Sequence, residues 1–325
     1  MSINAFPSLL LWPLALIGLA ACVLAGMLAT PLRRPPPLAS IHAGAMAIDQ
    51  IDKPELTRLQ ARDGTWLAYR LYPAGAGAAD RLAIVTHGSS ASSDEMHVVA
   101  RELAKSGVTA VAIDARGHGA SGARGDIAYI GQLDDDLADL IAELRKSYPI
   151  AKLEFIGHSS GGGFVARIAA TPVGKDFDRF ILLSPFLGVR APTNRPGEGA
   201  GAWAAVDLPR ILALSLLRRV GIDWGQSLPV IGFANAPEAI KFVTPVYSYR
   251  LLTDYGPAWD WRASFEANGP RMVVIAGADD ELMDATAYGP TLAPLGVKVT
   301  LVPNVDHMGV VYKPEALATI VAAAQ

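Results

Sequence analysis

The hydrophobic positions along the chain alternate between two periods, and this alternation is the first guide to the fold. Short apolar runs are typical of buried strands, and stretches with helical spacing separate them. Buried strands that alternate with helices predict an α/β fold, with a mostly parallel sheet covered by helices on both faces. The expected strands are 81–88, 108–114, 152–157, 179–184, 271–277 and 298–304, and the expected helices are 97–107, 133–148, 162–171 and 313–324.

Two segments depart from this alternation. At 55–73, two strand-like stretches flank Asp63 and Gly64, and this turn chemistry predicts an antiparallel hairpin that leads into the sheet. Between about 186 and 262 the alternation stops, and prolines, aromatic residues and short helical pieces such as 209–221 take its place. We interpret this stretch as a cap insertion beyond the carboxyl ends of the strands, where ligands bind in such sheets.

Composition narrows the classes of function. The chain has 325 residues, 51% of them apolar, and a net charge of -3, so a sizeable core is expected and no nucleic-acid partner is. Cys22 is the single cysteine, which excludes an intrachain disulfide. We find no zinc-type spacing and no glycine-rich nucleotide motif after a strand, so we expect neither a metal nor another cofactor. The oligomeric state is left open.

The sequence "GHSSGG" at 157–162 joins an expected strand to an expected helix. Gly157, Ser159 and Gly161 fit the pattern G-x-S-x-G, which in this context is typical of a nucleophile elbow. The serine of such an elbow stands on a sharp turn, where bulky neighbours two residues away on either side would collide. We therefore predict that Ser159 is a nucleophile at the amino terminus of a helix.

A serine hydroxyl needs a general base, and the base needs an orienting acid. His307, in "NVDHMG" after the last strand, fits the order Ser, then acid, then His along the chain. The acidic run 276–284 follows the preceding strand, and within it we favour Asp280, with Asp279 second and Asp284 third. The remaining histidines are interpreted as structural or surface residues: His97 on the surface, and His87 and His118 shaping loops.

An oxyanion formed during acyl transfer needs backbone donors. The sequence "HGSS" at 87–90 follows the first long parallel strand, where such folds place one donor. We expect the backbone N–H groups of Ser89 and Ser160 to form the oxyanion hole.

Taken together, five motifs carry a resemblance to a known family. They are "THGSS" (86–90), "DARGHGASG" (114–122), "GHSSGG" (157–162), "GADDELMD" (277–284) and "DHMG" (306–309). Over residues 55–325 the chain resembles α/β-hydrolases, and within them the monoacylglycerol lipase and lysophospholipase-like group with a serine-aminopeptidase-type signature. In that group a G-x-x-D pattern places the acid at its fourth position, which is Asp280 counted from Gly277.

The resemblance implies a serine hydrolase that cleaves carboxylic esters through an acyl-enzyme. The expected substrate is a lipid-type ester such as a monoacylglycerol or a lysophospholipid. Two alternatives stay open: a prolyl-aminopeptidase-like serine peptidase, and a hydrolase fold that serves as a non-catalytic binding module.

The amino-terminal segment is apolar from Pro7 to Thr30, and Arg33 and Arg34 follow it. About 20 such residues span a bilayer, and arginines after the span favour a cytoplasmic carboxyl-terminal side. We therefore expect a single-pass transmembrane anchor at 1–32, a linker at 33–53 and an α/β-hydrolase domain at 54–325. The alternative is export after cleavage of a signal peptide, or a lipoprotein signal that ends at Cys22.

Overall fold

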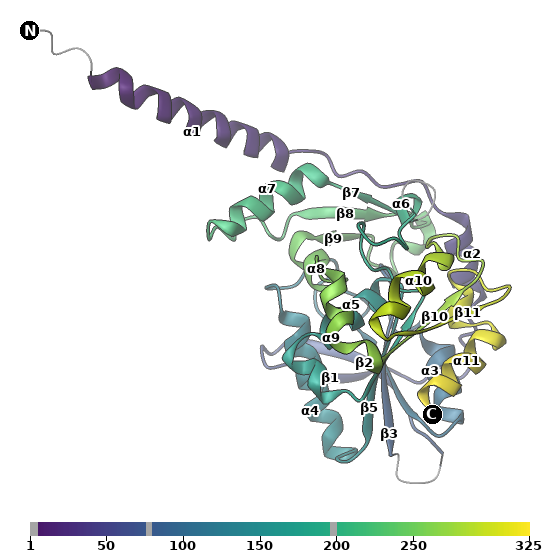
Figure 1. The fold of residues 1–325 in the computed structure, drawn as a ribbon. Helices are drawn as coiled ribbons and strands as arrows, with labels where there is room; N and C mark the ends of the chain where they lie inside the picture. Colours follow the sequence, from purple (N-terminus) through teal and green to yellow (C-terminus); the bar gives the residue numbers. More distant parts are fainter. Residues whose placement is uncertain (1–5, 76–79, 196–199) are drawn as a thin grey trace, which may run out of the picture.

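The computed structural model describes residues 6–75, 80–195 and 200–325, with side chains described from residue 12 onward except at 200 and 201. Its centre is an eight-stranded sheet in the order β1-β2-β4-β3-β5-β6-β10-β11 (Figure 1). The six strands from β4 to β11 in this order pair in parallel. The mostly parallel sheet expected from the alternating pattern is therefore confirmed.

The strands follow the apolar runs of the sequence closely. Their central residues, such as Ile84, Val111, Phe155 and Val274, are completely buried, as expected for strands covered on both faces. The hairpin β1–β2 is antiparallel, as the turn at Asp63 and Gly64 predicted. The strand β2 also pairs antiparallel with β4. The strands of this sheet are β1 (Thr57–Gln60), β2 (Trp66–Tyr72), β3 (Arg81–Thr86), β4 (Thr109–Asp114), β5 (Lys152–His158), β6 (Arg179–Leu183), β10 (Met272–Gly277) and β11 (Lys298–Val302).

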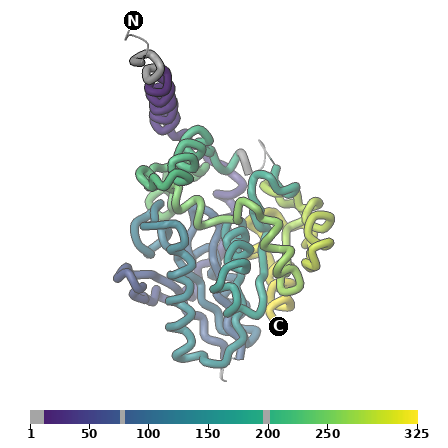
Figure 2. Tube along the Cα trace, turned by 60° about the vertical axis from the view of Figure 1, so that its left-hand side comes forward, coloured from purple at the N-terminus to yellow at the C-terminus, as the bar shows by residue number. Residues whose placement is uncertain are grey.

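Helices cover both faces of the sheet. On one face α3 (His97–Lys105) packs against α11 (Pro314–Ala324), and on the other α5 (Ser160–Ala169) packs against α9 (Trp261–Asn268) and the sheet (Figures 1 and 2). The helix α4 (Gln132–Ser147) turns its apolar stripe of leucines to the core, which is the amphipathic pattern seen in the sequence. The remaining helix beside β10 and β11 is α10 (Ala285–Leu292).

The segment between β6 and β10 forms a cap beyond the strand ends (Figure 1). It contains a three-stranded antiparallel sheet, which the sequence did not predict because its strands are too short to show a period. The predicted helix at 209–221 is present as α7. The elements of the cap are α6 (Ala200–Trp203), β7 (Ala204–Val206), α7 (Leu208–Arg219), β8 (Pro229–Phe233), β9 (Val246–Ser248) and α8 (Tyr249–Asp254).

The amino-terminal segment corrects one expectation. The helix α1 (Phe6–Leu28) extends away from the sheet and packs against α7 (Figures 1 and 2). Within the described residues, no helix has the length and apolar character of a membrane span. The expected transmembrane anchor at 1–32 is therefore wrong.

The expected linker at 33–53 contains a helix. This helix, α2 (Ala39–Ala47), lies across the carboxyl ends of the strands and is fixed at both ends. At its start the Leu38 N–H donates to the carbonyl of Ala234 in the cap, 3.0 Å away. Beyond its end Arg101 of α3 forms an ion pair with Asp49 at 2.8 Å. The amino-terminal segment thus forms part of the cover over the sheet.

Candidate active site

The turn between β5 and α5 carries Ser159 in a backbone conformation that side chains rarely adopt, with φ 53° and ψ -119°. Its glycines are required sterically. A Cβ atom on Gly157 would lie 2.3 Å from the carbonyl oxygen of Gly161, and one on Gly161 would lie 2.2 Å from that of His87. Both distances are far below a van der Waals contact, so the turn excludes any other residue at these two positions. The strained serine is held where two loops converge.

Three side chains that the sequence singled out lie in one chain of hydrogen bonds. The Oγ of Ser159 lies 3.0 Å from Nε2 of His307, whose Nδ1 lies 2.9 Å from Oδ2 of Asp280. These residues follow β5, β11 and β10, so the parallel strand ends bring them to one edge of the sheet. The other oxygen of Asp280 accepts the backbone N–H groups of Leu282 and Met283 at 2.9 and 2.8 Å. The carboxylate is therefore fixed from both sides.

Burial and charge set the protonation of this group. Ser159, Asp280 and His307 are 6%, 1% and 1% exposed. Burial lowers the pKa of His307, but the charge and hydrogen bond of Asp280 outweigh it and raise the pKa above its ordinary value. Burial raises the pKa of Asp280, but the charge and hydrogen bond of His307 outweigh burial and hold this pKa below its ordinary value. Because ionised Asp280 only accepts, Nδ1 of His307 carries a proton and Nε2 is free to take one from Ser159.

The other acidic residues of the two loops have different surroundings. Asp279 is exposed, and Asp284 caps α10 by accepting the N–H of Thr286 at 3.1 Å. Glu281 was not singled out from the sequence, yet its Oε2 accepts the backbone N–H of His307 at 3.0 Å. No signal in the acidic run distinguishes this role, since it depends on how the loop after β11 folds back. Asp280 is thus the acid of this run that reaches the imidazole.

The two expected oxyanion donors lie next to Ser159 and next to β3. Ser160 is the first residue of α5, and its N–H has no acceptor within that helix. Ser89 lines the cavity described below, and its Oγ accepts the indole N–H of Trp203 at 2.7 Å. The assignment of these two amides to an oxyanion hole stays a prediction.

The cap holds the loop that carries Ser89. The backbone N–H of Ser90 donates to the hydroxyl of Tyr247 at 2.5 Å, and its Oγ donates to the carbonyl of Thr244 at 2.8 Å. In return the N–H of Thr244 donates to the carbonyl of Ser90 at 2.8 Å. Ser90 itself has a positive φ of 71°, which is uncommon for a residue with a side chain. This loop therefore depends on the cap for its conformation.

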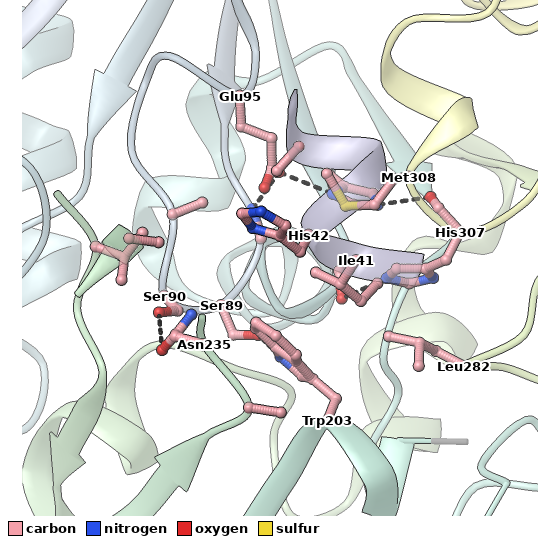
Figure 3. A pocket seen from close by; sticks show the side chains of 18 of the residues that line it. Ile41, His42, Ser89, Ser90, Glu95, Trp203, Asn235, Leu282, His307 and Met308 are labelled. Atoms are coloured by element: carbon pink, nitrogen blue, oxygen red, sulfur yellow. Dashed lines mark hydrogen bonds and ion pairs between the residues drawn. The ribbon is translucent and has the colours of Figure 1, made fainter. Parts of the chain in front are cut away.

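The group opens into a small cavity of about 100 Å³ (Figure 3). Ile41 and His42 project from α2 into the set of side chains that includes Trp203 and His307. Sequence reasoning missed these α2 residues, because 33–53 has the composition of a linker. Most other lining positions are apolar, namely Ala91, Ala234, Ala236, Ala239, Val243, Leu282 and Met308.

Four other histidines are buried and hydrogen-bonded, namely His87, His97, His118 and His158, whereas His42 of α2 is only half-buried. As predicted, His87 fixes its loop: its Nδ1 lies 2.7 Å from the carbonyl of Gly88. The Nε2 atom of His118 lies 2.6 Å from the hydroxyl oxygen of Tyr247. The prediction that His97 is a surface residue is wrong, because its ring is buried between the hydroxyl of Tyr72 and the carbonyl of Ile51, each 2.9 Å away. The segment after α2 folds over the start of α3 and covers it.

The strand order, the cap and the serine elbow define the class: the protein is an α/β-hydrolase. Residues 77–287 match the model of the family described as serine aminopeptidase, S33, and the chain belongs to this family. It is a serine hydrolase of the group that resembles monoacylglycerol lipases, as the motifs predicted.

Two curated relatives and one solved structure show the range of this likeness. Protein phosphatase methylesterase 1 of Gibberella zeae is 29% identical over 240 residues, which cover 65% of this chain and 57% of the relative. Monoacylglycerol lipase of Mycolicibacterium smegmatis is 28% identical over 208 residues, or 53% of this chain and 74% of the relative. The monoglyceride lipase of Saccharomyces cerevisiae shares the fold, with a TM-score of 0.59 and 15% identity over 84% of this chain and 94% of that one. The match thus spans little more than half of the methylesterase.

Proposed function

We propose that the protein hydrolyses carboxylic esters of lipid type, such as monoacylglycerols or lysophospholipids, through an acyl-enzyme on Ser159. The observation that carries the proposal is the hydrogen-bonded series from Ser159 through His307 to Asp280 at the edge of an apolar cavity. The name of one relative, a monoacylglycerol lipase, gives such a lipid ester as its substrate. The cavity walls offer an acyl group apolar contact, which such a substrate needs.

The proposed reaction begins when Oγ of Ser159 attacks the ester carbonyl carbon and its proton passes to Nε2 of His307. The N–H groups of Ser89 and Ser160 stabilise the oxyanion that forms. The carbon–oxygen bond to the alcohol then breaks, and His307 returns the proton to the leaving alcohol. A water molecule, deprotonated by His307, releases the acid and restores Ser159. Asp280 holds the imidazole in the tautomer that these transfers require.

The charges around the cavity favour an ester over the amino terminus of a peptide. An aminopeptidase needs a carboxylate that is free to bind the substrate ammonium. Among the described residues that line the cavity, Glu95 is the one with a carboxylate. Its Oε1 already lies 2.8 Å from Nδ1 of His158. Glu238 of the cap is largely exposed and lies 3.5 Å from His42. Each of these two carboxylates already has a histidine partner.

The test compares substrates on the full chain and on Ser159→Ala. We expect hydrolysis of p-nitrophenyl esters and monoacylglycerol, none of an aminoacyl anilide, and covalent labelling of Ser159 by a fluorophosphonate. Ser160→Ala serves as the matched control for labelling, because its side chain is adjacent but makes no bond to His307. Preferred cleavage of prolyl anilide would favour the peptidase, and absence of both turnover and labelling would favour a binding module. Labelling of Ser160 or Ser89 would contradict the elbow assignment.

A further inference from the structure

A second pair of titratable side chains lies beside the site and takes no part in the proposed reaction. Glu95, just before α3, and His158, the last residue of β5, form an ion pair of 2.8 Å between Oε1 and Nδ1. Their side chains are only 9% and 1% exposed. Burial of such a pair is costly unless its remaining donors and acceptors are satisfied. Here Oε1 of Glu95 and both ring nitrogens of His158 have partners in the loops of the site.

The ring of His158 is held between two loops. Its Nδ1 faces the carboxylate of Glu95, and its Nε2 lies 3.1 Å from the backbone carbonyl oxygen of His307. An ionised carboxylate and a carbonyl oxygen both only accept hydrogen bonds. Each ring nitrogen of His158 therefore faces an acceptor from a different loop.

The charge of Glu95 is consistent with this arrangement. Burial alone would raise the pKa of Glu95, but the charge of His158 and the hydrogen bonds to His158 and Gly88 outweigh it, so the pKa lies below its ordinary value. The N–H of Gly88 donates to the same oxygen at 2.7 Å. The other titratable groups close to the pair are His87, His307, Tyr247 and Tyr255.

We propose that the pair of Glu95 and His158 positions two loops of the active site relative to each other. Glu95 holds Gly88, which precedes Ser89, while His158 precedes Ser159 and holds the carbonyl of His307. The ring of His158 also packs on that of His307, with centroids 4.8 Å apart. The positioning role rests on the proposed function of His307.

The space around the pair leaves it little freedom. A Cβ atom on Gly88 would lie 3.2 Å from Nδ1 of His158 and 3.3 Å from Oε1 of Glu95, so glycine is what lets the loop approach this closely. Loss of the carboxylate charge weakens the contact at Nδ1 of His158, so the ring is then held firmly only by the carbonyl of His307.

The test reads the positioning role in variants of the pair. Glu95→Gln keeps the shape of the side chain and an oxygen for the N–H of Gly88, so we expect a folded protein. Its kcat on a p-nitrophenyl ester should fall by about tenfold to a hundredfold, the loss that a small misplacement of catalytic groups causes, with KM within about twofold. Glu102→Gln on α3, away from the cavity, is the control and should keep the native kcat.

Unchanged kcat in Glu95→Gln, or a loss expressed in KM alone, would overturn the positioning role. If Glu95→Gln shows a lowered melting temperature, the kcat of His158→Gln decides. This variant keeps an amide that can donate to the carbonyl of His307 but loses the charge, so it should retain more activity than His158→Ala. Equal activity of these two variants would contradict the proposal. Failure of the proposed function appears differently, as a native chain that hydrolyses none of the esters.

Discussion

The floor and the cover of the active site are built in different ways. The floor consists of loops at the carboxyl ends of β3, β5, β10 and β11, whose polar side chains are buried and bound to one another. The cover consists of α2 and the cap, and it presents mainly apolar side chains to the cavity. Polar contacts on the floor have fixed directions, whereas apolar contacts in the cover depend on size and shape. We infer that the floor determines the chemistry and the cover determines which acyl group fits.

The largest expected effects lie on the floor. Ser159→Ala or His307→Ala should abolish nearly all turnover of a p-nitrophenyl ester, and Asp280→Asn should lower kcat by on the order of 10⁴-fold, because the wrong tautomer of the base is favoured. The double variant of Ser159 and His307 should be no worse than either single one. Asp279→Asn, at an exposed position, is the matched control and should be fully active. Activity in Asp280→Asn together with loss in Asp279→Asn would move the acid by one residue.

A smaller loss of activity is expected where a residue of the cover binds a loop of the floor. Tyr247→Phe removes the hydroxyl that accepts the N–H of Ser90 and also contacts His118. The buried N–H is left unpaired, so stability should fall by about 1–3 kcal/mol and kcat by about tenfold. Tyr249→Phe is the control, because its hydroxyl bonds Ser215 within the cap, 3.0 Å away. Equal kcat losses in both variants, measured beside their melting temperatures, would mean that the cap acts on stability alone.

The pH profile should separate burial from charge at the base. His307 works as a base when unprotonated, and its pKa is raised above the ordinary value of 6.5. The kcat/KM should therefore rise with pH through a midpoint above 6.5. In Asp280→Asn the charge that raises the pKa is gone and burial, which lowers it, remains, so the midpoint of the residual activity should shift to lower pH. A midpoint that moves upward in this variant would contradict the assigned cause.

The smallest effect is expected in the cover alone. Ile41 of α2 is buried and lines the cavity, so Ile41→Ala should increase kcat/KM for an octanoate ester relative to an acetate ester by several-fold to about tenfold, the scale set by one or two methylene groups. Met46→Ala, on the exposed side of the same helix, is the matched control. An unchanged ratio in Ile41→Ala, from chain-length profiles of the two variants, would show that α2 does not bound the acyl group.

The same contrast explains what could be predicted from the sequence. The floor was predictable because it follows from motifs with local steric reasons, such as glycine at 157 and 161. The structure of the cover was not predictable in the same way, because the three short strands of the cap have no readable period. The role of α2 in the cover depends on a close contact between Gly44 and Met308, which are far apart in the sequence. The bond of Glu281 to the base loop and the pairing of Glu95 with His158 join positions far apart in the chain. A single sequence carries no signal for such pairings.

The dependence of Ser90 on the cap has a consequence for the evolution of this protein. Its positive φ costs free energy of order 1–3 kcal/mol in a residue with a side chain, and Thr244 and Tyr247 stabilise it from the insertion. A chimera whose insertion lacks the Tyr247 hydroxyl would leave the N–H of Ser90 without this partner while keeping the loop at 87–91. Such an exchange should therefore impair the hydrolase, and new substrate ranges should arise through linked changes in the two segments.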